Sequence, residues 1–212
     1  MDILLSKNTF CRQTVSDKVV SEIHIPAYTG NGTGLLVSLD LEARSTDALQ
    51  LYADGQVATS LQKIFKRAIS ILSRLHQDWK ILTQFEYRLI SRNTNFRVMD
   101  ARSASLSLCI SLINILRHIS GLSQVNNLIG TGILRFDGSF DESSLEDKKQ
   151  SAALHTNKRF LTSASCPHVF NLVTFMNQYQ NYSPSCVILS VSEGSASLNT
   201  IQGSGDPSLR SR

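Results

Sequence analysis

A long amphipathic pattern between Val57 and Trp79 constrains the fold most. Apolar residues recur there in steps of three and four, as in a helix that buries one face. These residues are Val57, Leu61, Ile64, Ala68, Ile71, Leu72, Leu75 and Trp79. The basic residues of the segment fall on its other faces: Lys63, Lys66, Arg67 and Arg74. A helix of this kind must pack its apolar stripe against another layer of structure.

Strand-like segments are interspersed with this helix and with further helical patterns. Alternating or continuous apolar residues predict strands over residues 35–42, 48–53, 85–90, 128–136 and 186–191. Helical spacing predicts helices over residues 57–79, 103–119, 144–155 and 167–179. We therefore expect an α+β (α/β-like) fold with mixed sheets packed against about four helices.

The chain has the length and composition of one folded domain. Its 212 residues are 42% hydrophobic and 18% charged. A chain of this size can bury a core that needs no metal or disulfide bond to stabilise it. We expect an N-terminal segment over residues 1–27 without a firm assignment, a domain over residues 28–191, and a flexible Ser/Gly-rich tail over residues 192–212. The glycine-dense residues 28–34 are expected to form a turn.

Composition also disfavours several function classes. A net charge of +4 is too mild to imply nucleic acid by itself. No apolar run approaches the roughly 20 residues that span a bilayer, and the first residues lack a secretory-signal pattern, so we expect a cytoplasmic protein without a membrane partner. The four cysteines are scattered and the histidines lack metal-ligand spacing. We expect reduced structural cysteines, no metal and no cofactor.

Ser103 and Lys149 are the candidate reactive pair. Ser103 directly precedes the second long helical pattern, and Lys149 lies in the helix predicted over residues 144–155. A serine hydroxyl is a poor nucleophile until a base takes its proton, and a lysine amine is such a base when desolvation lowers its pKa. The commoner roles are a helix N-cap for Ser103 and a solvated surface residue for Lys149. The two residues alone leave both interpretations open.

The surrounding motifs resemble those of the proteolytic domain of Lon-family proteases. Residues 100–105, Asp-Ala-Arg-Ser-Ala-Ser, are similar to the family pattern Asp-Gly-Pro-Ser-Ala-Gly around its nucleophile. Residues 131–133, Thr-Gly-Ile, are similar to the family's Thr-Gly-Glu. Residues 149–153, Lys-Gln-Ser-Ala-Ala, are similar to its Lys-x-x-Ala-Ala helix entry. The resemblance spans roughly residues 34–191.

This resemblance implies a Lon-like fold and a stand-alone serine peptidase. Ser103 would be the nucleophile and Lys149 the general base, whereas a one-residue gap in the match would make Lys148 the base. Thr131 would orient the lysine amine, and Asp100 would fix the serine loop. The sequence has no Walker A pattern, so we expect hydrolysis without an ATPase of its own. The implied partners are a peptide or unfolded protein substrate, and either further copies of the chain or a separate AAA+ protein.

Two other functions stay open. Ala101, Arg102 and Ser105 stand where the family has Gly, Pro and Gly, so the chain is alternatively a catalytically degenerate Lon-like domain that acts as an interaction or assembly module. A nucleic-acid contact is the third function, along a segment that interleaves arginines with aromatic residues. Its members are Phe85, Tyr87, Arg88, Arg92, Phe96, Arg97 and Arg102. A simply solvated face is the commoner explanation of such a segment.

Overall fold

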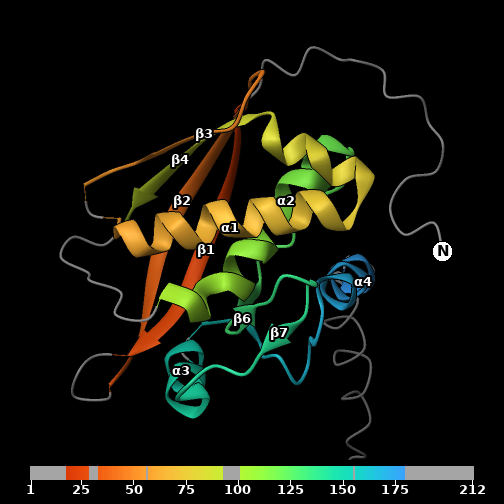
Figure 1. Cartoon of the computed structure of the whole chain (residues 1–212). Helices are drawn as coiled ribbons and strands as arrows, with labels where there is room; N and C mark the ends of the chain where they lie inside the picture. Colours follow the sequence, from red (N-terminus) through yellow and green to blue (C-terminus); the bar gives the residue numbers. More distant parts are fainter. Residues whose placement is uncertain (1–17, 29–32, 56, 93–100, 155, 180–212) are drawn as a thin grey trace, which may run out of the picture.

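The computed structural model describes residues 18–28, 33–55, 57–92, 101–154 and 156–179. Within these residues the chain has an α+β fold, in which helices cover one face of a four-stranded sheet (Figure 1). Two small two-stranded sheets complete the described part. The α+β class predicted from the sequence is confirmed.

The main sheet is mixed and has one apolar face. Its order is β1 (Val19–Tyr28), β2 (Gly34–Ser45), β4 (Phe85–Ser91) and β3 (Gln50–Ala53). The pairs β1–β2 and β2–β4 are antiparallel, and β3–β4 is parallel. Alternate side chains of the long strands are buried, so that Leu41 lies opposite the equally buried Leu89. The predicted strands at residues 35–42, 48–53 and 85–90 correspond to β2, β3 and β4.

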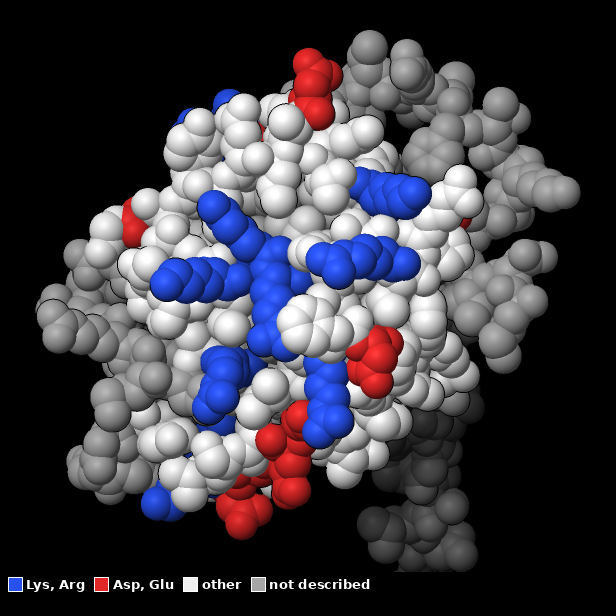
Figure 2. Space-filling view, viewed as in Figure 1, with Lys and Arg blue, Asp and Glu red and all other residues white. Residues whose placement is uncertain are grey.

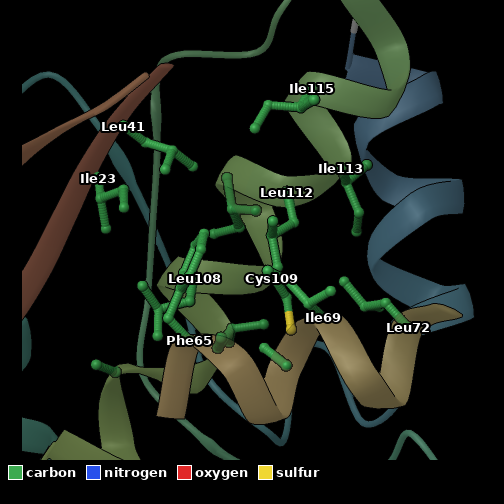
Figure 3. Close-up of a cluster of buried hydrophobic side chains, with 14 of the residues drawn as sticks. Ile23, Leu41, Phe65, Ile69, Leu72, Leu108, Cys109, Leu112, Ile113 and Ile115 are labelled. Carbon is green, nitrogen blue, oxygen red and sulfur yellow. The ribbon is translucent and has the colours of Figure 1, made fainter. Parts of the chain in front are cut away.

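The described helices are α1 (Thr59–Leu75), α2 (Ser105–Ile119), α3 (Glu146–Ala153) and α4 (Val169–Tyr179), with 3₁₀ turns η1 (Gln77–Thr83) and η2 (Ala101–Ala104). α2 is buried along almost its whole length. Figure 3 shows its side chains Leu108 and Cys109 among those of Phe65 and Ile69 from α1. The core therefore lies between α1, α2 and the apolar face of the sheet.

Each of the four described helices is shorter than the predicted one, and two of the differing boundaries concern Trp79 and Ser103. α1 ends at Leu75, because His76 has extended backbone angles (φ −145°, ψ 138°), and Trp79 lies in η1. The His76 ring nitrogen accepts a hydrogen bond from the Asp78 amide, which stabilises this break. Ser103, predicted as the first residue of the second long helix, lies instead in η2 just before α2.

β1 forms the edge of the sheet, and its sequence had predicted no element. Buried residues alternate along most of it: Val19, Ser21, Ile23, Ile25 and Ala27. Its edge carbonyls at Glu22 and His24 accept hydrogen bonds from Ser111 (3.0 Å) and Ser107 (2.6 Å) of α2. A helix therefore covers an edge that would otherwise expose unpaired backbone groups.

The predicted strand segment at residues 128–136 divides between the two small sheets. β5 (Leu128–Gly130) pairs in parallel with β8 (Arg159–Leu161), and β6 (Ile133–Leu134) pairs with β7 (Phe140–Asp141). The predicted strand at residues 186–191, the tail and the central residues of the 28–34 turn lie outside the described residues. None of the described helices is long and apolar enough to cross a membrane.

Candidate active site

Ser103 is a buried residue of the turn that leads into α2. Only 3% of its surface is exposed. Its backbone carbonyl accepts hydrogen bonds from the amide of Gly132 (3.0 Å) and the hydroxyl of Thr131 (3.4 Å). The N-cap of α2 is Ala104, which has no capping side chain. The commoner explanation of Ser103, an N-cap of this helix, therefore does not apply.

Thr131 connects the Ser103 turn to the segment before α3. The residue is fully buried between β5 and β6, and its amide donates to the carbonyl of Leu161 (2.9 Å). Its hydroxyl oxygen lies 2.8 Å from the Ser143 hydroxyl oxygen. The threonine predicted from the resemblance thus contacts the candidate nucleophile's own turn and the approach to the lysine helix.

Ser143 is a polar site residue that the sequence reasoning missed. Its amide (3.2 Å) and its hydroxyl (3.3 Å) both donate to the carboxylate of Glu146, the first residue of α3. Residues 143–146 read Ser-Ser-Leu-Glu, the Ser-x-x-Glu spacing typical of a helix start. That spacing is the signal that could have revealed it. Ser143 thus anchors the beginning of the helix that carries Lys149.

α3 buries Lys149 and exposes Lys148. Lys149 is 1% exposed, and its Nζ atom lies 5.7 Å from the centroid of the Tyr28 ring. Lys148 is exposed to solvent. Of the two lysines that the sequence offered, the structure places Lys149 in the protein interior. Burial disfavours the charged form of an amine and so favours the neutral form, which can accept a proton.

A close backbone contact determines where α3 lies. A Cβ atom added at Gly34, the first residue of β2, would be 2.2 Å from the backbone oxygen of Lys148 and 3.3 Å from the Cβ of Ala152. Such a distance to backbone cannot be accommodated without movement. The absence of a side chain at Gly34 is therefore a condition for the present position of Lys149.

We expect Gly34→Ala to lower the free energy of unfolding by about 1–3 kcal/mol, because the added methyl group overpacks the β2–α3 contact. Urea unfolding, monitored by circular dichroism, measures this free energy. Gly55→Ala is the matched control, because a Cβ atom there meets nothing within 4 Å. Equal stability of the two variants would contradict the close contact.

The remaining candidate groups do not add to this site. Asp100 lies outside the described residues, as do Phe96 and Arg97. Burial raises the pKa of the Cys166 thiol to about 12 and also raises that of Cys109, so neither is a reactive thiolate at neutral pH. No group of three or more His, Cys, Asp or Glu side chains that could hold a metal occurs among the described residues.

The arginine-rich segment of β4 does not present its aromatic residues to solvent. Phe85 and Tyr87 are buried in the core, where they cannot stack on bases. On the exposed side, Arg88 pairs with Glu86 (3.0 Å). Arg92 pairs with two carboxylates, at 2.8 Å and 2.6 Å. The charges of Arg88 and Arg92 are therefore largely neutralised by carboxylates of the protein itself.

No model of a known protein family matches the chain, and no curated protein matches it significantly. The function is therefore inferred from the residues and geometry of the site.

Proposed function

We propose that the chain is a Lon-like serine peptidase domain that hydrolyses peptide bonds with Ser103 as nucleophile and Lys149 as general base. One observation carries this proposal. Lys149 is buried on a helix whose first turn is hydrogen-bonded through Ser143 to Thr131, and the next residue, Gly132, donates its amide to the carbonyl of Ser103.

Burial of this lysine needs a reason other than stability. Lysines are among the residues least often fully buried, and removing an ammonium group from water costs several kcal/mol. α3 is only eight residues long and has an exposed lysine next to the buried one. A helix that could present either side chain to solvent thus encloses one amine in the protein interior. Buried ionisable groups of this kind are often found at functional sites.

The proposed reaction needs no metal or nucleotide. The neutral amine of Lys149 takes the proton of the Ser103 hydroxyl while the Oγ atom attacks the peptide carbonyl carbon. The resulting ammonium gives this proton to the leaving nitrogen as the C–N bond breaks, which leaves an acyl-enzyme. The same amine then takes a proton from water while the water oxygen attacks the ester carbonyl. The acyl group leaves as a carboxylic acid, and the ammonium returns the proton to the serine oxygen. Thr131 orients the lysine helix through Ser143.

The order of the motifs supports the Lon-like assignment. A serine precedes a buried helix, a threonine follows the next strand, and a lysine lies on a short helix after a hairpin. The same proposal includes an unfolded or peptide substrate and assembly with further copies of the chain or with an AAA+ partner.

A second candidate is a catalytically degenerate Lon-like domain that acts as an interaction or assembly module. The near-complete burial of Ser103 favours it, because a substrate carbonyl must reach the Oγ atom before the reaction can begin. Arg102 directly precedes Ser103 and is exposed. The family pattern has proline at this position, so Arg102 is a further departure from that pattern.

Incubation with denatured casein, without nucleotide, distinguishes the two candidates. The peptidase should produce fragments with new N-termini at a rate that neither ATP nor a metal chelator changes. Electrophoresis and N-terminal labelling measure this. If casein, a panel of fluorogenic peptides and the chain itself all remain intact, the degenerate module is the better description.

A further inference from the structure

The outward side of α1 carries positive charge that the proposed peptidase site does not use. Its four cations are Lys63, Lys66, Arg67 and Arg74, which we call the basic face. Their spacing places them on one side of the helix, opposite its buried residues. No acidic residue occurs between Asp54 and Asp78. Figure 2 shows the blue side chains gathered where α1 crosses the front of the molecule.

These charges are not neutralised by the described residues. No ion pair joins any of the four to a carboxylate in the described part of the chain. Arg74 donates to the hydroxyl of Ser70 (2.6 Å). The Arg67 guanidinium lies 4.5 Å from the centroid of the Phe136 ring. Like charges one helical turn apart repel each other, so an unneutralised row of them is suited to an anionic partner.

Phe136 places an exposed aromatic ring at this face. It is 73% exposed and lies in the turn between β6 and β7. The turn is closed by a hydrogen bond from the Arg135 amide to the Ser139 carbonyl (2.9 Å). At Gly138, where φ is +91°, a Cβ atom would be 2.6 Å from the Leu75 side chain of α1. The turn is thus packed against α1 and holds Phe136 in place.

We propose that the basic face and Phe136 together bind single-stranded nucleic acid. Phosphates would contact the four cations, and an unpaired base would stack on the Phe136 ring. From Lys63 to Arg74 the helix rises by about 16 Å, enough for a few nucleotides. A duplex keeps its bases stacked on each other and offers none to the ring. A membrane surface would require a row of apolar residues along the helix, and this face has a single exposed ring.

Fluorescence anisotropy with labelled oligo(dT) tests the proposal. The logarithm of the binding constant should fall with the logarithm of the salt concentration with a slope of about −2 to −3, as expected for up to four phosphate contacts at about 0.7 each. Lys63→Gln/Lys66→Gln should weaken binding and make the slope shallower by about 1.4. Phe136→Ala should weaken binding about five-fold or more at an unchanged slope, because it removes only stacking.

The control variant Lys18→Gln/Arg88→Gln removes two positive charges, as many as Lys63→Gln/Lys66→Gln does. Both charges lie outside the basic face, on residues that pair with Glu42 and Glu86. It should bind oligo(dT) like the wild type. Thermal unfolding by circular dichroism verifies that each variant is folded. Absence of binding at low salt, or equal weakening by the control, would overturn the proposal. The proposal would also be overturned if the chain bound duplex DNA or phosphatidylserine vesicles as tightly as oligo(dT) and if Phe136→Ala did not weaken that binding.

Discussion

Ser103→Ala should reduce casein cleavage by about 10³-fold or more while the chain remains folded. A methyl group has no proton to give up and no lone pair to attack a carbonyl, so the acyl-enzyme cannot form. Losing one hydroxyl from the interior should lower the free energy of unfolding by only about 1–2 kcal/mol. Initial cleavage rates and urea unfolding measure the two effects separately.

Ser105→Ala is the matched control for this substitution. Ser105 is also buried, two residues away, and its hydroxyl donates to the backbone carbonyl of Arg102 (2.6 Å). The variant should lose about 1 kcal/mol of stability and keep most of its activity. Equal losses of activity in the two variants would indicate that the shape of the turn matters and that Ser103 is not the nucleophile.

Lys149→Met should abolish cleavage to a similar extent without destabilising the fold. Methionine has a similar volume, and replacing a buried ionisable group by an apolar one of similar volume is often neutral or stabilising. We therefore expect the free energy of unfolding to stay the same or rise. This combination of lost activity and retained stability is what a base held in the interior for catalysis would give.

Lys148→Met tests the neighbouring residue under the same conditions. Because Lys148 is exposed, its replacement should leave both rate and stability close to those of the wild type. Full activity in Lys149→Met would exclude Lys149 as the base. A loss of several kcal/mol in that variant would instead assign the lysine a structural role.

The sequence predicted the elements that bury one side, because one-sided burial gives their apolar residues a regular spacing. β2, β4 and the body of α1 follow directly from alternating or helical apolar spacing. The break at His76 could not be predicted, because a local hydrogen bond and an extended backbone stop a helix that the apolar spacing would continue to Trp79. β1 escaped prediction because Ser21 and Ala27 weaken its apolar alternation.

The candidate residues could be named from the sequence, but their arrangement in space could not. The motifs identified Ser103, Thr131 and Lys149, which the structure buries. The choice between two adjacent lysines depends on how α3 packs against Gly34, more than a hundred residues earlier in the chain. Periodicity carries no information about such long-range contacts. The same holds for Phe136, whose position beside α1 depends on the packing of a distant turn.

Mass-spectrometric mapping after treatment with a serine-directed fluorophosphonate tests the central claim most directly. The reagent reports which hydroxyl is activated, because it bonds only to a nucleophilic oxygen. We predict one adduct per chain, on the peptide that contains Ser103, and none in Lys149→Met. No adduct, an adduct on Ser105, or equal labelling of the wild type and Lys149→Met would contradict the proposal.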